Sequence, residues 1–358
     1  MLINEYFPCE DGDKVECFIA DKDIRHINEK IMNEYSRNIF ENRLLYSLTG
    51  NYEHIRRIVL GTEAGKKMNR LLYKPSYIYG AGKRGKLLVE TFGNKQWQGF
   101  IDVNKNGNYE GYPVYRWDDF TYQGDASVVI SNKYGYDEIR RNLVRDKKVP
   151  EEKIIILEHF YKMADIERYF EPEPLKAISM ENQVFMDLGC YDGVDTIRAL
   201  DFWKEENINV CAVEPDRKNY LVCKDNFKGY ERITLINRGI GEKKEKKNFI
   251  EGGEGARFSD AGDKAVEIDT IDHIANGNTV GFIKMDIEGY EEEALLGGQK
   301  TIKRCKPVLA VCIYHKRSDV WRIPLQILKL NDSYRFYLGH YTLDWGDTVL
   351  YAVDKKDL

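Results

Sequence analysis

The chain has 358 residues, of which 42% are hydrophobic and 32% charged, a composition typical of a globular protein and not of a disordered one. Its formal net charge of −5 argues against a broad surface for the phosphate backbone of a nucleic acid. The seven cysteines include no C-x-x-C pair, which favours a reduced, cytoplasmic protein over a disulfide scaffold or a zinc ribbon. No apolar run reaches the roughly 20 residues of a membrane span, and the length predicts two or three domains.

Residues 1–73 are expected to form a helical N-terminal segment. Apolar side chains recur there at helical spacing, namely Ile24, Ile27, Ile31, Tyr35, Leu44, Leu45 and Leu48. The segment contains no group of side chains that suggests chemistry. We therefore expect its apolar face to pack on another part of the chain.

Residues 74–170 alternate between predicted strands and helices, which indicates a small Rossmann-like α/β domain. The predicted strands cover 76–80, 97–102, 126–131 and 152–157, and the predicted helices cover 85–92 and 136–144. Gly80, Gly82 and Gly85 have the G-x-G-x-x-G spacing of a turn that wraps a pyrophosphate. Asp102 closes the next predicted strand, where an acid can bind a ribose.

This first glycine turn leaves two alternatives open. One is an NAD(P)-dependent oxidoreductase, although no Tyr-x-x-x-Lys follows in the domain, which is also short for both halves of a dinucleotide. The other is a nucleotide or nucleotide-sugar binding module, because YIYGAGKRG, GFIDVN and GYPVY resemble the small N-terminal domain of bacterial sugar acyltransferases.

Residues 178–358 form a second α/β pattern, which begins after a boundary marked by Pro172 and Pro174. The predicted strands cover 183–189, 209–216, 232–240, 279–286 and 307–314, the helices 194–205 and 217–227, and a final hairpin 334–341 and 347–353. The run EKKEKK is expected to be a solvated loop. Five parallel strands followed by an antiparallel pair is the order of a Rossmann-like class I methyltransferase sheet. The predicted fold class is therefore α/β, with this domain preceded by the smaller Rossmann-like domain and the helical segment.

The second glycine turn, VFMDLGCYDGVDT, carries the strongest pattern. Asp187 closes a hydrophobic strand, Gly189 permits a tight turn and Gly193 opens the next helix. Glu214 ends the following strand, where a carboxylate can accept both ribose hydroxyls of an adenosyl group. A pyrophosphate is disfavoured beside the carboxylates of this turn, which instead suit a sulfonium and an α-amino group. We expect Asp187 or Asp192 to bind the ammonium group of that ligand, directly or through water.

A third stretch, GFIKMDIEGYEEEALLGG, delivers Lys284, Asp286 and Glu288 at the carboxyl end of an apolar strand. Ligands bind at that end of an open parallel sheet. The three side chains share one face if the strand persists that far. A structural Lys–Asp pair with a helix-capping Glu is the alternative reading.

Together DLGCYDGVDT, VEPD, VEIDTID, IKMDIEGYE and PVLAVCIYH resemble the FkbM-type family of S-adenosylmethionine-dependent methyltransferases over residues 183–353. Cys190 stands where this family often has alanine. The resemblance implies S-adenosylmethionine as cofactor and O-methyl transfer to a hydroxyl of a sugar, glycan precursor or natural product. The cofactor residues it implies are Asp187, Gly189, Tyr191, Gly193, Glu214, Asn237 and Gly239, with 237–240 bordering the adenine.

Methyl transfer to a hydroxyl requires a group that orients the nucleophile and removes its proton. The candidate bases are Asp286 and His315, which follows the fifth predicted strand. The acceptor-binding candidates are Glu288, Lys316 and His340. Mg²⁺ held by Asp286, Glu288 and Asp319 is conceivable, but their spacing is not tight enough to assign a metal site. The expected partners are a small-molecule or glycan acceptor and no nucleic acid, and a homo-oligomer is compatible with the sequence.

Overall fold

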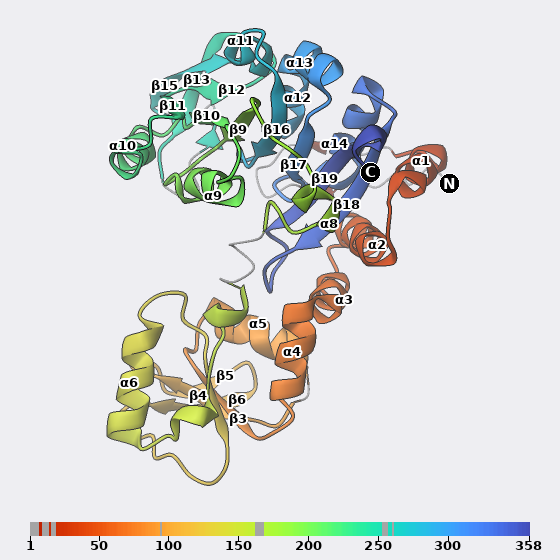
Figure 1. Ribbon diagram of the computed structural model, residues 1–358. Helices are drawn as coiled ribbons and strands as arrows, with labels where there is room; N and C mark the ends of the chain where they lie inside the picture. Colours follow the sequence, from red (N-terminus) through yellow and green to blue (C-terminus); the bar gives the residue numbers. More distant parts are fainter. Residues whose placement is uncertain are drawn as a thin grey trace. The chain divides into compact units, whose positions relative to one another are not determined.

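The structure is a computed structural model that describes residues 7–8, 14–15, 19–93, 95–161, 168–252, 257–259 and 261–358. The chain forms two compact units (Figure 1). The large unit combines Met1–Leu48, Arg168–Gly339 and Asp347–Leu358, and the small unit combines Thr49–Glu167 and His340–Gly346. In the part of the chain that the structure describes, no helix is long and apolar enough to cross a membrane.

Of the segment expected to be helical over 1–73, residues 1–6, 9–13 and 16–18 lie outside the described residues, and the helices found in the rest belong to different units. Helices α1 (Asp21–Lys30) and α2 (Glu34–Thr49) lie mainly in the large unit, after the short strands β1 (Phe7–Pro8) and β2 (Lys14–Val15). Helices α3 (Glu53–Gly61) and α4 (Glu63–Leu71) belong to the small unit. The physical reason is burial of separate apolar faces: Ile55, Ile58 and Met68 are fully buried in the small unit, and Ile27 and Ile39 in the large one.

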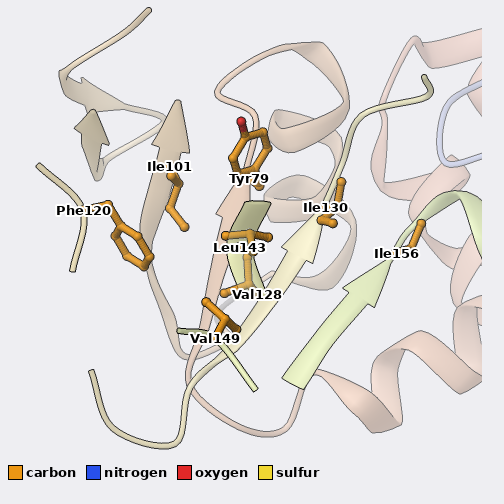
Figure 2. Packing of buried hydrophobic residues seen from close by; sticks show 8 residues of the cluster. All are labelled: Tyr79, Ile101, Phe120, Val128, Ile130, Leu143, Val149 and Ile156. Carbon is orange, nitrogen blue, oxygen red and sulfur yellow. The ribbon is translucent and has the colours of Figure 1, made fainter. Parts of the chain in front are cut away.

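The small unit contains a sheet with the strand order β5-β6-β4-β3-β7-β8, parallel except for the β5–β6 pair. Its elements are β3 (Ser76–Tyr79), α5 (Lys83–Phe92), β4 (Trp97–Asp102), β5 (Gly107–Tyr109), β6 (Tyr112–Arg116), β7 (Ser127–Ile130), α6 (Tyr136–Lys147), the 3₁₀ turn Glu151–Lys153 and β8 (Ile154–Ile156). The β5–β6 hairpin was not expected from the sequence. Figure 2 shows one side of this sheet, where Ile101, Val128 and Ile130 pack with Leu143 of α6.

The large unit contains a sheet with the strand order β11-β10-β9-β16-β17-β19-β18, in which β19 runs antiparallel to β17. Its elements are α8 (Glu173–Lys176), β9 (Val184–Leu188), α9 (Val194–Phe202), β10 (Asn209–Val213), α10 (Arg217–Asn226), β11 (Ile233–Ile236), β16 (Val280–Met285), α12 (Glu291–Gly297), α13 (Gln299–Cys305), β17 (Val308–Cys312), α14 (Asp319–Leu330), β18 (Tyr334–His340), β19 (Thr348–Asp354) and the 3₁₀ turn Lys355–Asp357. Strands β16 and β17 are buried along their whole length, as parallel strands with both faces covered must be. This strand order confirms the predicted Rossmann-like methyltransferase sheet.

A second, smaller sheet lies between β11 and β16 in the chain, with the order β12-β15-β13-β14. Its elements are β12 (Gly239–Ile240), β13 (Glu245–Ile250), β14 (Arg257–Phe258), β15 (Lys264–Asp269) and the short helix α11 (Ile271–Ala275). The loop predicted for EKKEKK is wrong at its C-terminal half, because Glu245–Ile250 is a strand paired with β15. Its lysines lie at the surface of the strand, and Phe249 is buried.

Candidate active site

The second glycine turn follows β9 and is held by the ends of two neighbouring strands. The N–H groups of Gly189 and Cys190 both donate to the carbonyl of Val213, at 2.9 and 3.1 Å. Gly189 has a φ of 77°, and a Cβ there would lie 1.9 Å from the carbonyl oxygen of Asp286. Gly193 has a φ of 80° and begins α9 against the ring of Phe227. Both positions therefore require glycine, and the turn lies directly on the backbone that follows β16.

Glu214 follows β10 and faces this turn. Its Oε2 accepts the N–H of Tyr191 and its Oε1 accepts the N–H of Asp216, both at 2.9 Å. The side chain is buried, and burial raises the pKa of Glu214 to about 7 although these amides lower it. Besides the two backbone donors, the side chain of Asn219 also donates to this carboxylate. A carboxylate has about four lone-pair positions, so Glu214 retains capacity for a hydroxyl donor of a ligand.

Of the other predicted cofactor residues, Tyr191 and Asn237 contact Glu214, and Gly239 lies on the neighbouring small sheet. Tyr191 has a left-handed φ of 51° and exposes 41% of its surface, so its ring is accessible beside the turn. Asn237 donates to the carbonyls of Glu214 and Pro215, at 2.8 and 3.1 Å, and thereby fixes the backbone of the acid. Gly239 starts β12, and a Cβ there would lie 2.2 Å from the ring of Phe258.

Asp187 is completely buried and its carboxylate is occupied within the protein. Lys284 is its register partner on β16, with Nζ 2.9 Å from Oδ1, and Thr196 donates to Oδ2 at 2.6 Å. Lys284 also donates to the carbonyl of Gly189 at 2.6 Å. Burial lowers the pKa of Lys284, but Asp187 and other carboxylates outweigh it and raise this pKa. Asp187 thus orders the glycine turn, and its carboxylate is completely buried between Lys284 and Thr196.

Asp286 lies just beyond β16 and is held from three sides. Tyr169 donates to Oδ2 at 3.0 Å and Tyr314 donates to Oδ1 at 3.1 Å. The Nε2 atom of His315 lies 3.4 Å from Oδ1. These contacts fix the carboxylate at the edge of the sheet where β16 and β17 end, next to the glycine turn.

Two further carboxylates lie beside His315, on the imidazole ring that also contacts Asp286. Its Nδ1 lies 3.0 Å from Oε1 of Glu291, and its Nε2 lies 3.7 Å from Oε2 of Glu288. We call Asp286, Glu288, Glu291 and His315 the acid–imidazole cluster. Glu288 is the accessible member, since 36% of its side chain is exposed against 8% for His315 and 1% for Glu291.

The charges of this cluster shift one another. Burial lowers the pKa of His315, but Glu291 and Asp286 outweigh it and raise this pKa well above 6.5. Burial raises the pKa of Asp286, but the contact with His315 outweighs it and holds this pKa well below its usual range. Burial and the neighbouring carboxylates together raise the pKa of Glu288 to about 7. The cluster therefore carries more negative charge than one imidazolium neutralises.

The structure separates some residues that the sequence pattern grouped. Strand β16 ends at Met285, so Lys284, Asp286 and Glu288 do not share one strand face, and Glu288 has a left-handed φ of 54°. Lys316 is half-exposed, lies 3.7 Å from Glu293 and its Nζ lies 5.9 Å from the ring centroid of Tyr290. His340 is buried at the end of β18 and belongs to the small unit.

Three residues of the site escaped the sequence reasoning, namely Tyr169, Glu291 and Tyr314. Tyr314 adjoins His315, and Glu291 is one of three consecutive glutamates, so only the buried helix face distinguishes it. Tyr169 lies 117 positions before Asp286, and no local pattern connects the two.

The first glycine turn is occupied by its own protein groups. The N–H of Gly80 donates to Ile101, and the N–H of Ala81 donates to Oδ2 of Asp102 at 2.9 Å. Oδ1 of Asp102 accepts the N–H groups of Asn104 and Lys105, at 2.9 and 3.0 Å. A pyrophosphate needs such turn amides and is repelled by a carboxylate on them. This geometry disfavours the oxidoreductase alternative.

The model of the methyltransferase FkbM domain matches residues 156–338, and no curated protein matches. Among solved structures, the FkbM methyltransferase of Methylobacillus flagellatus KT has a TM-score of 0.47 at 17% identity, covering 87% of this chain and 99% of that chain.

Two ligand-bound structures show the same kind of likeness. Aeropyrum pernix fibrillarin with natively bound S-adenosylmethionine has a TM-score of 0.34 at 12% identity, covering 54% of this chain and 73% of that chain. A Streptococcus mutans protein described as a methyltransferase, in complex with S-adenosylhomocysteine, has a TM-score of 0.33 at 11% identity, covering 54% of this chain and 97% of that chain. Because the FkbM domain match spans more than half of the 358 residues, the chain belongs to the FkbM methyltransferases, which are S-adenosylmethionine-dependent enzymes.

Proposed function

We propose that the protein is an O-methyltransferase that binds S-adenosylmethionine at the second glycine turn and methylates a hydroxyl of a sugar, glycan precursor or natural product. One observation carries this proposal. Gly189 of the turn lies on the carbonyl of Asp286, so the cofactor turn and the acid–imidazole cluster share one piece of backbone. A methyl donor held at the turn and a hydroxyl held at the cluster would be neighbours.

The residues at the turn fit the proposed cofactor. Glu214 would accept the ribose hydroxyls, since it is buried, retains lone pairs and is positioned through Tyr191 and Asn237. The N–H groups of Gly189, Cys190 and Tyr191 are used by the protein, which leaves no amide cradle for a pyrophosphate. When bound, the cofactor supplies a methyl group made electrophilic by its sulfonium.

The acid–imidazole cluster would orient the acceptor and take its proton. Asp286 is fixed by two tyrosine hydroxyls and by His315, so it can hold a hydroxyl in one position. Glu288 is the accessible carboxylate beside it. The hydroxyl proton would pass to this pair of carboxylates, while His315 and Lys284 keep Asp286 ionised.

The surroundings of Glu288 suit a sugar-like acceptor. The half-buried ring of Tyr290 packs on Phe258, with 4.7 Å between ring centroids. The ammonium groups of Lys247 and Lys316 lie 5.1 and 5.9 Å from the centroid of the Tyr290 ring. An aromatic surface bordered by cations and carboxylates matches a ligand with apolar ring faces and polar edges.

The test is the turnover and product of an Asp286→Asn variant. Because this change removes an ionised carboxylate from the hydroxyl but leaves the turn intact, we expect turnover to fall by roughly 100-fold or more. Affinity for S-adenosylhomocysteine, measured by calorimetry, should stay within about threefold. Acceptors would be screened as a panel of monosaccharides, nucleotide sugars and polyhydroxylated natural products, with the methylated atom identified by NMR.

The matched control is Asp225→Asn, which removes an exposed carboxylate of α10 that pairs with Lys228. It should retain wild-type turnover. Methylation confined to amines or carbon atoms would contradict the proposal, and so would wild-type turnover of Asp286→Asn.

A further inference from the structure

Three members of the acid–imidazole cluster, Asp286, Glu288 and His315, place oxygen and nitrogen atoms near one another at distances that are long for hydrogen bonds. One atom each of Asp286, Glu288 and His315 lies within 4.8 Å of the other two. From Nε2 of His315, the carboxylate oxygens lie at 3.4 Å for Asp286 and 3.7 Å for Glu288. These separations are long for hydrogen bonds. They are close to the roughly 3 to 3.5 Å between neighbouring ligand atoms that each bind one cation at about 2.1 Å.

His315 is oriented as metal-binding histidines are. Its side chain is more than nine-tenths buried, and neither ring nitrogen has a hydrogen-bond partner of acceptable geometry. One ring nitrogen, Nδ1, lies 3.0 Å from the carboxylate of the buried Glu291. A carboxylate beside one ring nitrogen orients the ring, and a cation at the second nitrogen would take the place of the proton there.

Asp286 is also supported from outside in the manner of a metal ligand. The hydroxyls of Tyr169 and Tyr314 donate to its two oxygens, at 3.0 and 3.1 Å. Such outer hydrogen bonds hold a ligating carboxylate in place and still leave it lone pairs. Glu288 completes the set from a half-exposed position, which provides a path of entry from solvent.

The charge balance calls for a cation at the same place. Asp286, Glu288 and Glu291 surround the single imidazole, and Asp319 is a further buried carboxylate that forms a second triple with Glu291 and His315. The second triple is the poorer site, because both its carboxylates are buried and Asp319 accepts the N–H of Lys316 at 2.6 Å. Two largely buried cations, Lys284 and Arg168, also act on Asp286, but Lys284 is paired with Asp187 and Arg168 with Asp347.

We propose that Asp286, Glu288 and His315 bind a divalent first-row cation such as Mn²⁺ or Zn²⁺, with water completing the coordination. One nitrogen and two carboxylate ligands favour these ions over Ca²⁺. The cation's role in catalysis rests on the reaction proposed above. In that reaction, the acceptor hydroxyl would replace one of the waters on the cation and would lose its proton more readily. Binding of the cation itself depends only on the three side chains.

The test measures Mn²⁺ binding to the full chain after chelator treatment, by electron paramagnetic resonance and by calorimetry. Wild-type protein should bind one equivalent with a Kd below about 10⁻⁴ M. Glu288→Gln and His315→Gln should each weaken binding by about 10-fold or more, because each loses a ligand. Glu292→Gln is the matched control, since this glutamate follows the cluster on α12 but pairs with Arg322. It should bind Mn²⁺ as the wild type does.

Two outcomes would overturn the proposal: neither Mn²⁺ nor Zn²⁺ binds the wild-type protein at millimolar concentration, or both ligand variants bind as tightly as wild type. Glu288 is half-exposed, so its variant keeps the test valid if His315→Gln fails to fold. S-adenosylhomocysteine binding is measured on the same samples. Loss of cation binding with intact cofactor binding rejects only the metal site, whereas the reverse rejects only the proposed function.

Discussion

The two glycine turns of this chain begin in the same way and end differently. In each, the first glycine donates its N–H to the end of the neighbouring strand, at Ile101 for Gly80 and at Val213 for Gly189. In each, a later amide of the turn donates to the acid that follows that strand, at 2.9 Å in both cases. The backbone plan is therefore shared, and glycine spacing alone cannot separate a ligand site from a structural turn.

The acids themselves carry the difference. Asp102 accepts three N–H groups, which outweigh its burial and lower its pKa. Glu214 accepts two backbone N–H groups and is almost fully buried, and burial raises its pKa to about 7 although these amides and Asn219 lower it. A carboxylate whose donors do not offset its desolvation gains from a ligand that brings more donors, while one whose donors outweigh its burial gains less. Burial of the acid thus distinguishes the two turns better than their sequence does.

The largest expected effect is a loss of stability caused by a steric clash in the second glycine turn. An alanine Cβ at Gly189 would lie 1.9 Å from the carbonyl oxygen of Asp286, at a φ of 77° that alanine also resists. We expect Gly189→Ala to destabilise the protein by more than about 5 kcal/mol. Gly82→Ala is a control in the first turn at a glycine with a φ of −126° and no heavy atom within 4 Å of an added Cβ. Its cost should stay within about 1 kcal/mol.

Thermal melting of both variants checks this expectation. Gly189→Ala should lack a native transition or melt far below the wild type, and Gly82→Ala should melt within a few degrees of it. Similar melting of both variants would mean that the Asp286 backbone can yield, and that the turn is not held where the proposed site needs it.

The next largest effect concerns ligand affinity. Glu214→Ala removes the carboxylate proposed to accept two ribose hydroxyls, and charge-assisted hydrogen bonds contribute about 1.5 to 3 kcal/mol each. Affinity for S-adenosylhomocysteine should therefore fall roughly 1000-fold, or about 4 kcal/mol. Asp102→Ala should leave this affinity unchanged. Calorimetric titration distinguishes the two, and an equal loss in both variants would end the assignment of the second turn as the cofactor site.

Much of the fold can be predicted from the sequence, because local apolar runs mark its strands. Strands β16 and β17 are recognisable as buried parallel strands from their composition, and the final β18–β19 hairpin from its turn. Glu214, Asp286 and His315 follow three of these predicted strands, so the sequence points to them as candidates at the carboxyl edge of the sheet.

Side-chain partners were less accessible, because they depend on register and burial. Lys284 and Asp187 were both noticed, but their pairing requires β16 and β9 to be aligned so that these residues are neighbours. Tyr169 reaches Asp286 from a segment outside the predicted methyltransferase pattern. The desolvation that separates Glu214 from Asp102 is a property of the packed protein, and no spacing rule reports it.

The smallest effect is the pH dependence of stability. It separates the two acids most specifically, because their pKa values shift in opposite directions. Glu214 has a folded pKa of about 7 against 4.5 for an unperturbed glutamate. Between these values the unfolded state has already lost a proton that the folded state keeps, so stability falls as the pH rises from about 4.5 to 7. The pKa of Asp102 is lowered, so its contribution is present above its unfolded pKa and is lost at more acidic pH.

Other raised carboxylates, such as Glu288 and Asp319, give slopes of the same sign, so the informative quantity is the difference between wild type and Glu214→Gln. The variant has no carboxylate to desolvate. Its stability relative to wild type should rise by up to about 3 kcal/mol between pH 5 and 8, measured by chemical denaturation at each pH. Asp102→Asn should show no such gain. A flat difference for Glu214→Gln would mean that Glu214 is already as well solvated as Asp102, and the physical distinction between the two turns would disappear.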